Sequence, residues 1–213
     1  MKSVIRKHKH FWAQEPYIVS TLIGAILLAI SLLALYFANL YVSFHASNSV
    51  SDIILDHIPV INVNFLFSEG ALIFLVILLL VNLLEPRHIP FVLKGTALFI
   101  VARCFFMILT HTAPPIHMSY LDPTTLIYKL SSGDDLFFSF HTGLPFFMAL
   151  VFWDEKYLRY FFIFSAIVGA TVVLLGHLHY SIDVFSALFI SYGVFQIAKY
   201  LFPKDFLFYN PKR

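Results

Sequence analysis

Charged residues and cysteine are both scarce in this sequence. Asp, Glu, Lys and Arg make up 12% of the 213 residues, while 60% are hydrophobic. A soluble domain carries roughly a quarter charged residues, so the composition excludes an ordinary soluble fold. Cys104 is the only cysteine and lies within an apolar run, which excludes a disulfide within the chain. The net charge of +2 is small and the positive residues are spread over several loops, so we expect no nucleic-acid partner.

Long apolar stretches dominate the rest of the chain. A helix needs about 20 apolar residues to cross about 30 Å of hydrocarbon. Six stretches qualify, and they predict an all-α integral membrane protein, a six-transmembrane-helix bundle that forms a single domain over residues 1–213. They cover residues 17–41, 66–84, 89–110, 136–153, 159–176 and 180–201. The first is too long for a signal-peptide core and is interpreted as a retained anchor.

The distribution of Lys and Arg predicts the orientation of these spans. Of the 14 Lys and Arg residues, all except Lys129 and Arg103 lie near the N-terminus, the second and fourth loops or the C-terminus. We therefore expect both termini to be cytoplasmic, with residues 1–15 as a short cytoplasmic tail. A short chain without sorting domains favours a bacterial inner membrane over an endomembrane.

Polar residues at the ends of two apolar stretches are the candidates for chemistry. His179 and Asp183 are spaced i, i+4, so on a helix they share one face. The carboxylate can hold one imidazole nitrogen and leave the other as a nucleophile. His141, at the start of the fourth span, can act as general acid because its ordinary pKa suits proton transfer near neutrality. The predicted orientation puts all three on the extracytoplasmic side, where the chemistry they favour is phosphoryl transfer on a lipid.

Such a reaction needs positive charge and N–H donors around the phosphoryl oxygens. Arg103, within the third span, is the main candidate, and Lys129 and the backbone from Ser139 to Thr142 are others. These residues can also have purely structural roles: Arg103 can pair with Glu69, and the His179–Asp183 pair can cap a helix. His177, His179 and Asp183 also offer three metal ligands, although a short loop entering a helix makes their convergence awkward.

The motifs around these residues are similar to those of the sphingomyelin synthase family, a branch of the type 2 phosphatidic acid phosphatase superfamily. Residues 135–142, Asp-Leu-Phe-Phe-Ser-Phe-His-Thr, resemble the family motif Asp-x-x-x-Ser-Gly-His-Thr. Residues 179–184, His-Tyr-Ser-Ile-Asp-Val, resemble its His-Tyr-Thr-x-Asp-Val motif. Arg103 with the residues after it resembles an arginine-led motif on the third span. The resemblance covers about residues 52–195, the expected catalytic core.

The resemblance implies a catalytic triad, and substrate-binding residues are expected around it. His141, His179 and Asp183 would form the triad. The substrate would be bound by Arg103, Lys129, Asp135, Ser139, Thr142 and Tyr180. Family members transfer a phospho-headgroup from a glycerophospholipid donor to ceramide, diacylglycerol or a similar lipid alcohol, and no metal or other cofactor is expected.

Two departures from the family pattern bear on activity. Phe140 stands where the family has glycine, which lets a backbone approach a phosphate closely. The Ser-Arg pair that phosphatases of the superfamily place before the second histidine is absent, and Val172 and Val173 stand near that place. The second departure favours the synthase-like branch. A lipid phosphate phosphatase, and a catalytically silent lipid-binding or lipid-moving protein, remain the alternatives.

Overall fold

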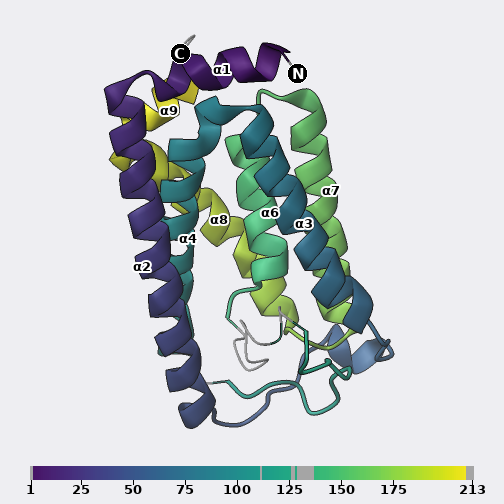
Figure 1. Cartoon of the computed structure of the whole chain (residues 1–213). Helices are drawn as coiled ribbons and strands as arrows, with labels where there is room; N and C mark the ends of the chain where they lie inside the picture. Colours follow the sequence, from purple (N-terminus) through teal and green to yellow (C-terminus); the bar gives the residue numbers. More distant parts are fainter. Residues whose placement is uncertain (1, 111, 126–127, 129–136, 210–213) are drawn as a thin grey trace.

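The computed structural model of the chain describes residues 2–110, 112–125, 128 and 137–209, and in them all regular structure is helical. The described helices make a bundle of long rods with loops at one end (Figure 1). In chain order they are α1 (Lys2–Trp12), α2 (Glu15–His45), η1 (Leu55–His57), α3 (Asn64–Leu84), η2 (Pro86–His88), α4 (Ile89–Leu109), α6 (Phe140–Val151), α7 (Lys156–Leu175), α8 (Ser181–Leu201) and α9 (Pro203–Tyr209).

Among the described residues, five helices are long and apolar enough to cross a membrane, which confirms the predicted class of fold. They are α2, α3, α4 with the preceding η2 turn, α7 and α8. Each coincides with a predicted span to within a few residues. The exposed side chains of the outer helices are large and apolar, as a lipid-facing surface requires. On α2 they include Leu22, Ile26, Ile30, Leu33 and Phe37.

The fourth span is shorter than the 136–153 predicted from hydropathy. The helix α6 has 12 residues, which is about 18 Å of helix against about 30 Å of hydrocarbon. Ser139 caps the N-terminus of α6, because its side chain accepts a hydrogen bond from the backbone N–H of Thr142. Phe152 ends the helix on the other side, where a tight turn leads into α7. In Figure 1 the lower end of α6 lies well above the lower end of α2.

Aromatic side chains fill the centre of the bundle, where α4, α6 and α8 meet. The helix α2 packs along α4, and α7 packs along α6. Offset and edge-to-face ring pairs connect these elements, as between Phe99 and Phe147 and between Phe147 and Phe195. The fully buried phenylalanines of this core are Phe91, Phe99, Phe138, Phe147, Phe152 and Phe162.

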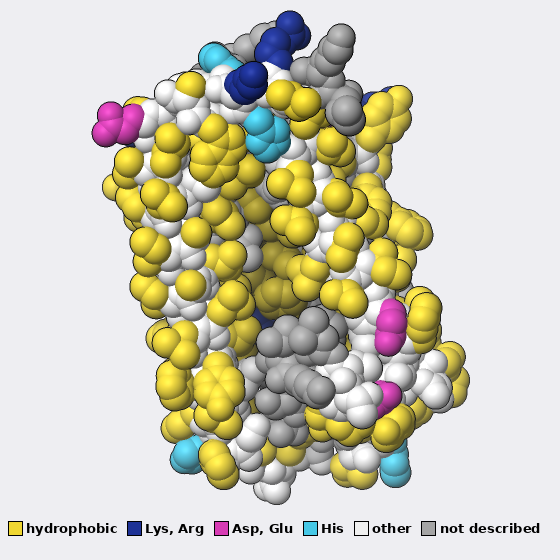
Figure 2. Space-filling view, viewed as in Figure 1, with side chains coloured by type: hydrophobic (Ala, Val, Ile, Leu, Met, Phe, Trp, Pro, Cys, Tyr) yellow, Lys and Arg dark blue, Asp and Glu magenta, His cyan; other side chains and the backbone are white. Residues whose placement is uncertain are grey.

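One end of the bundle gathers both terminal helices and the short turns (Figure 1). The predicted tail 1–15 is largely helical there: α1 lies across the bundle end, and an ion pair from Lys7 holds it. Lys7 pairs with Glu85, and Arg87 pairs with Glu155, so the α3–α4 and α6–α7 turns are tied together. Tyr17 at the start of α2 donates a hydrogen bond to the Pro86 carbonyl at 2.6 Å. This is the Lys- and Arg-rich end in Figure 2, as expected for a cytoplasmic face.

Candidate active site

The turn between α7 and α8 positions His179 against Asp183. The Nδ1 atom of His179 lies 3.4 Å from Oδ2 of Asp183, and the two residues are 5% and 2% exposed. The same carboxylate oxygen accepts the backbone N–H of Tyr180 at 3.0 Å, which closes a capping box at the start of α8. The carboxylate is therefore fixed by the backbone and in turn orients the imidazole. Donation from Nδ1–H to the carboxylate leaves the lone pair of Nε2 for attack on an electrophile.

His141 is the second residue of α6 and contacts α3. Its Nε2 lies 3.2 Å from the carbonyl oxygen of Phe67, and its ring stacks on the Phe67 ring with centroids 4.1 Å apart. A carbonyl only accepts, so this contact requires the proton on Nε2 and leaves Nδ1 as the nitrogen that can exchange one. His141 also lies within electrostatic range of His179 and Arg103.

A backbone hydrogen bond joins the two histidine clusters. The N–H of Ser139 donates to the carbonyl oxygen of Asp183 at 3.1 Å, which fixes the start of α6 to the first turn of α8. The Ser139 hydroxyl meanwhile contacts the Thr142 hydroxyl at 3.2 Å and caps α6. Both side chains are buried. Ser139 and Thr142, predicted to bind substrate, thus make the contacts that fix the start of α6, which carries His141, to the first turn of α8.

A close contact with α7 fixes His141 from behind. A Cβ atom built on Gly169 would lie 2.1 Å from the carbonyl oxygen of His141 and 2.8 Å from its carbonyl carbon, so only glycine fits there. The same carbonyl has no helical donor four residues on, because Pro145 lacks an N–H. The Gly169 backbone thus packs against a carbonyl that lacks its helical donor. Sequence reasoning missed this residue.

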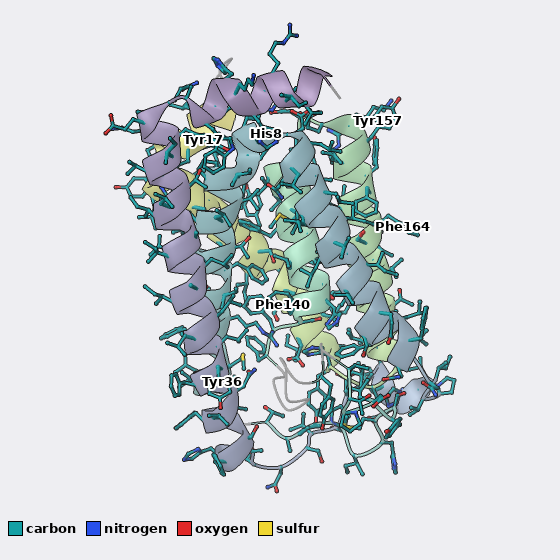
Figure 3. All side chains as sticks on the ribbon, viewed as in Figure 1. His8, Tyr17, Tyr36, Phe140, Tyr157 and Phe164 are labelled. Atoms are coloured by element: carbon teal, nitrogen blue, oxygen red, sulfur yellow. The ribbon has the colours of Figure 1, made fainter. Side chains whose placement is uncertain are left out.

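Arg103 on α4 is buried at the level of the two histidines, with 1% of its surface exposed. Its guanidinium carbon lies 5.9 Å from the ring centroid of Phe138 and 6.0 Å from that of Phe140, within the range of cation–π attraction. Phe140 therefore packs beside the predicted phosphate-binding arginine. Figure 3 shows Phe140 near the lower end of α6, and its ring also meets that of Phe99 edge-on.

Residues of the first loop and of the loop after α4 hold the start of α8 in place. The Tyr180 hydroxyl donates to the Ala113 carbonyl at 2.9 Å and accepts the Val50 N–H at 3.1 Å. The Asp52 carboxylate accepts the Ser181 N–H at 2.6 Å. These contacts give Tyr180, predicted to bind substrate, a role in holding loops together. Asp52 was missed because a single loop aspartate has no distinctive sequence pattern.

The pKa values of these two residues shift in opposite directions. Burial opposes ionisation of Asp52, but hydrogen bonds from Ser181, Leu55 and Ile54 outweigh it and lower the pKa of the carboxyl below its ordinary value. Burial raises the pKa of the Tyr180 hydroxyl, and the nearby carboxylates add to this effect. At neutral pH Asp52 is thus an anion and Tyr180 a neutral donor.

Two of the predicted substrate-binding residues, Lys129 and Asp135, lie outside the described residues. His177 is buried beside the pair, with a left-handed backbone (φ 51°) and no hydrogen-bond partner for Nε2 within the described part of the chain. In that same part, no three His, Cys, Asp or Glu side chains are grouped as a metal ion needs.

A hollow in the lipid-facing surface lies between α2 and α3. Figure 2 shows that its visible walls are hydrophobic and that Lys or Arg surface appears at its lower edge. Phe140 belongs to this part of the molecule, since it packs against the cluster of Ala38, Ile100 and Cys104 on α2 and α4. An apolar hollow open to the bilayer can receive acyl chains.

One comparison with known families bears on this site. Residues 133–200 match the family described as PAP2 superfamily C-terminal. This match supports a relationship of the chain to the PAP2 superfamily. The matched segment contains His141, His179 and Asp183, and the PAP2 assignment supports a membrane enzyme of the lipid phosphatase or phosphotransferase type. Neither the curated proteins nor the solved structures give a match.

Proposed function

We propose that this chain is a lipid phosphotransferase of the sphingomyelin synthase-like kind, with its active site on the extracytoplasmic side of a bacterial inner membrane. It would move a phospho-headgroup from a glycerophospholipid to ceramide, diacylglycerol or a similar lipid alcohol. The observation behind this proposal is the hydrogen bond from Ser139 N–H to the Asp183 carbonyl. It holds the helix start that bears His141 against the turn that bears His179, within the segment that matches the PAP2 superfamily.

The first step forms a phosphohistidine. The Nε2 lone pair of His179 attacks the phosphorus of the donor, and the bond from phosphorus to the diacylglycerol oxygen breaks. His141, protonated on Nδ1, gives that proton to the departing alkoxide, so diacylglycerol leaves as a neutral alcohol. Asp183 stabilises the positive charge that develops on the His179 ring, as the orienting carboxylate of a triad does.

The second step regenerates the enzyme. The hydroxyl of the acceptor attacks the phosphorus, the bond from phosphorus to Nε2 breaks, and Nδ1 of His141 takes the hydroxyl proton. A lipid alcohol as acceptor gives a new phospholipid, whereas water gives hydrolysis by the same residues. Arg103 would stabilise the charge on the phosphoryl oxygens in both steps, since a buried guanidinium acts in a low-dielectric site.

The shape of the site supports lipids as substrates. In Figure 1 the start of α6 lies well above the lower end of α2, so His141, the second residue of α6, would lie within membrane depth. The hollow between α2 and α3 would let a lipid approach sideways with its acyl chains in an apolar environment. Water would have to reach the same site to support hydrolysis, and a lipid alcohol held in the hollow would compete with it.

Purified protein in liposomes tests the proposal. The donor is phosphatidylcholine labelled in its headgroup, and the acceptor is a fluorescent ceramide or diacylglycerol. We expect a labelled, acceptor-linked product and, with donor alone, an acid-labile phosphoryl group on the protein. His179→Ala should abolish both without lowering the thermal unfolding temperature appreciably, while the exposed His117→Ala serves as the matched control.

Three outcomes would count against the proposal. Full turnover by the His179→Ala variant would eliminate the phosphohistidine. Release of phosphate or phosphocholine without transfer would favour the phosphatase alternative. No product from a range of donors and acceptors would favour a silent lipid-binding protein.

A further inference from the structure

A second cluster of buried polar residues lies at the opposite end of the bundle from the histidines. It joins α2, α4 and α9 through the side chains of Ser20, Lys94 and Asp205. The Nζ atom of Lys94 donates to Ser20 Oγ at 2.6 Å and to Asp205 Oδ2 at 2.7 Å, and the Ser20 hydroxyl also bonds to Asp205. Lys94 is 8% exposed and Asp205 4%. The proposed chemistry at His179 uses none of these residues.

This cluster opens onto a cavity with a volume of about 380 Å³. Its polar lining consists of the three clustered side chains and Lys204, which is exposed. Its apolar lining is Pro16, Leu201, Phe202 and Pro203. The cavity thus combines two ammonium groups and one carboxylate with an apolar wall at the level of the lipid headgroups.

The charges around the cavity favour an anion. An ammonium group has three donor hydrogens. Within the described part of the chain, two of those on Lys94 have oxygen acceptors, and the Phe202 ring centroid lies 5.4 Å from Nζ. Asp205 balances Lys94, so Lys204 leaves the site with a net positive charge. A third donor on Lys94 and the whole ammonium of Lys204 are therefore in place to hold phosphate oxygens.

We infer that this cavity binds the phosphate of an anionic phospholipid from the leaflet next to α1 and α9. Basic pockets between membrane helices on the cytoplasmic side hold such headgroups, and each lysine near an anionic surface strengthens binding about fivefold. The apolar wall formed by Leu201 and Phe202 would lie along the upper part of the acyl chains. A lipid bound there contacts α2, the end of α8 and α9 at once.

Lipid binding to purified full-length protein tests this inference without any activity measurement. The probes are phosphatidylglycerol, phosphatidylcholine and glycerol 3-phosphate, and binding is followed by native mass spectrometry and thermal shift. Lys204→Gln removes an exposed charge at the cavity and should weaken phosphatidylglycerol binding about fivefold. Lys156→Gln removes an exposed charge at the same end but away from the cavity and should leave binding unchanged. Lipid bound at the histidine site contributes equally to all of these proteins.

A double variant probes the buried pair. Lys94→Gln with Asp205→Asn removes both charges together, so no unpaired charge is left buried. This double variant should weaken phosphatidylglycerol binding at least as much as Lys204→Gln does. If the double variant fails to fold, the Lys204→Gln variant alone decides the test. Equal weakening by the Lys204 and Lys156 variants, or no weakening by either, would overturn the site. Glycerol 3-phosphate binding as tightly as the lipid would show that the ligand is a soluble phosphate.

Discussion

Alanine at Gly169 provides a sharp test of how His141 is positioned. The new Cβ would lie 2.1 Å from the His141 carbonyl oxygen, whereas Cβ atoms essentially never come closer than 3.0 Å to another heavy atom. The obstructing atoms belong to the backbone of α6 and cannot rotate away. The two helices must therefore separate by about 0.9 Å at this point, and His141 moves with α6.

The expected loss follows from that displacement. Misplacing a catalytic group by about 1 Å can reduce the rate about 100-fold, whereas overpacking a core costs about 1–3 kcal/mol of stability. We therefore expect the Gly169→Ala variant to fold, to unfold at a somewhat lower temperature, and to lose about two orders of magnitude in kcat. Lipid binding in the hollow should change little, because Gly169 belongs to α7 and the hollow lies between α2 and α3.

The assay is the liposome transfer reaction, measured together with thermal unfolding in detergent. Gly193→Ala is the matched control, because a Cβ there meets no atom within 4 Å. That substitution adds a methyl group to α8 and should stabilise the helix by about 0.5–1 kcal/mol without lowering kcat. A Gly169→Ala variant as active as the unmodified protein would refute the view that this contact sets the position of His141.

Two further substitutions test the surroundings of the site. Phe140→Gly removes a ring beside Arg103 and should raise the rate or widen the range of headgroups accepted, as measured with a panel of labelled donors; an unchanged profile would mean that the ring leaves the substrate site untouched. Asp52→Asn tests the anchor on α8. Since the Asp52 pKa is lowered on folding, its stabilising contribution is present above its ordinary pKa of 3.8 and is lost as the pH falls through the lower folded value. The difference in unfolding temperature between Asp52→Asn and the unmodified protein should therefore be largest at neutral pH and shrink below about pH 4, and a pH-independent difference would contradict this account.

Hydropathy was sufficient to predict most of the bundle, and the structure adds two details that have physical causes. A membrane span has a length that lipid dictates, so α2, α3, α4, α7 and α8 were visible in the sequence. The bounds of α6 were less visible, because the cap at Ser139 and the turn at Phe152 lie within a continuous apolar run. The helix α1 lies within the predicted tail, and hydropathy does not indicate the ion pair between Lys7 and Glu85 that holds it against the bundle.

The candidate residues could be named from the sequence by side-chain identity, and their catalytic role stays a prediction. His141, His179 and Asp183 are ionisable residues in an apolar chain, and the structure brings their backbones together. The partners that orient them were not predictable. Phe67 acts through its carbonyl oxygen, which every residue has, and Gly169 acts through the absence of a side chain. Neither contribution leaves a pattern in one sequence.

The 12-residue length of α6 sets the depth at which the candidate site lies. No side chain of α6 is exposed, so the longer helices around it meet the lipid. The helix start that carries His141 can therefore lie inside the bundle, away from the plane of the phosphate groups, without contacting hydrocarbon. A headgroup would have to leave that plane to reach the histidines, so the distance it must move should fall as the leaflet becomes thinner.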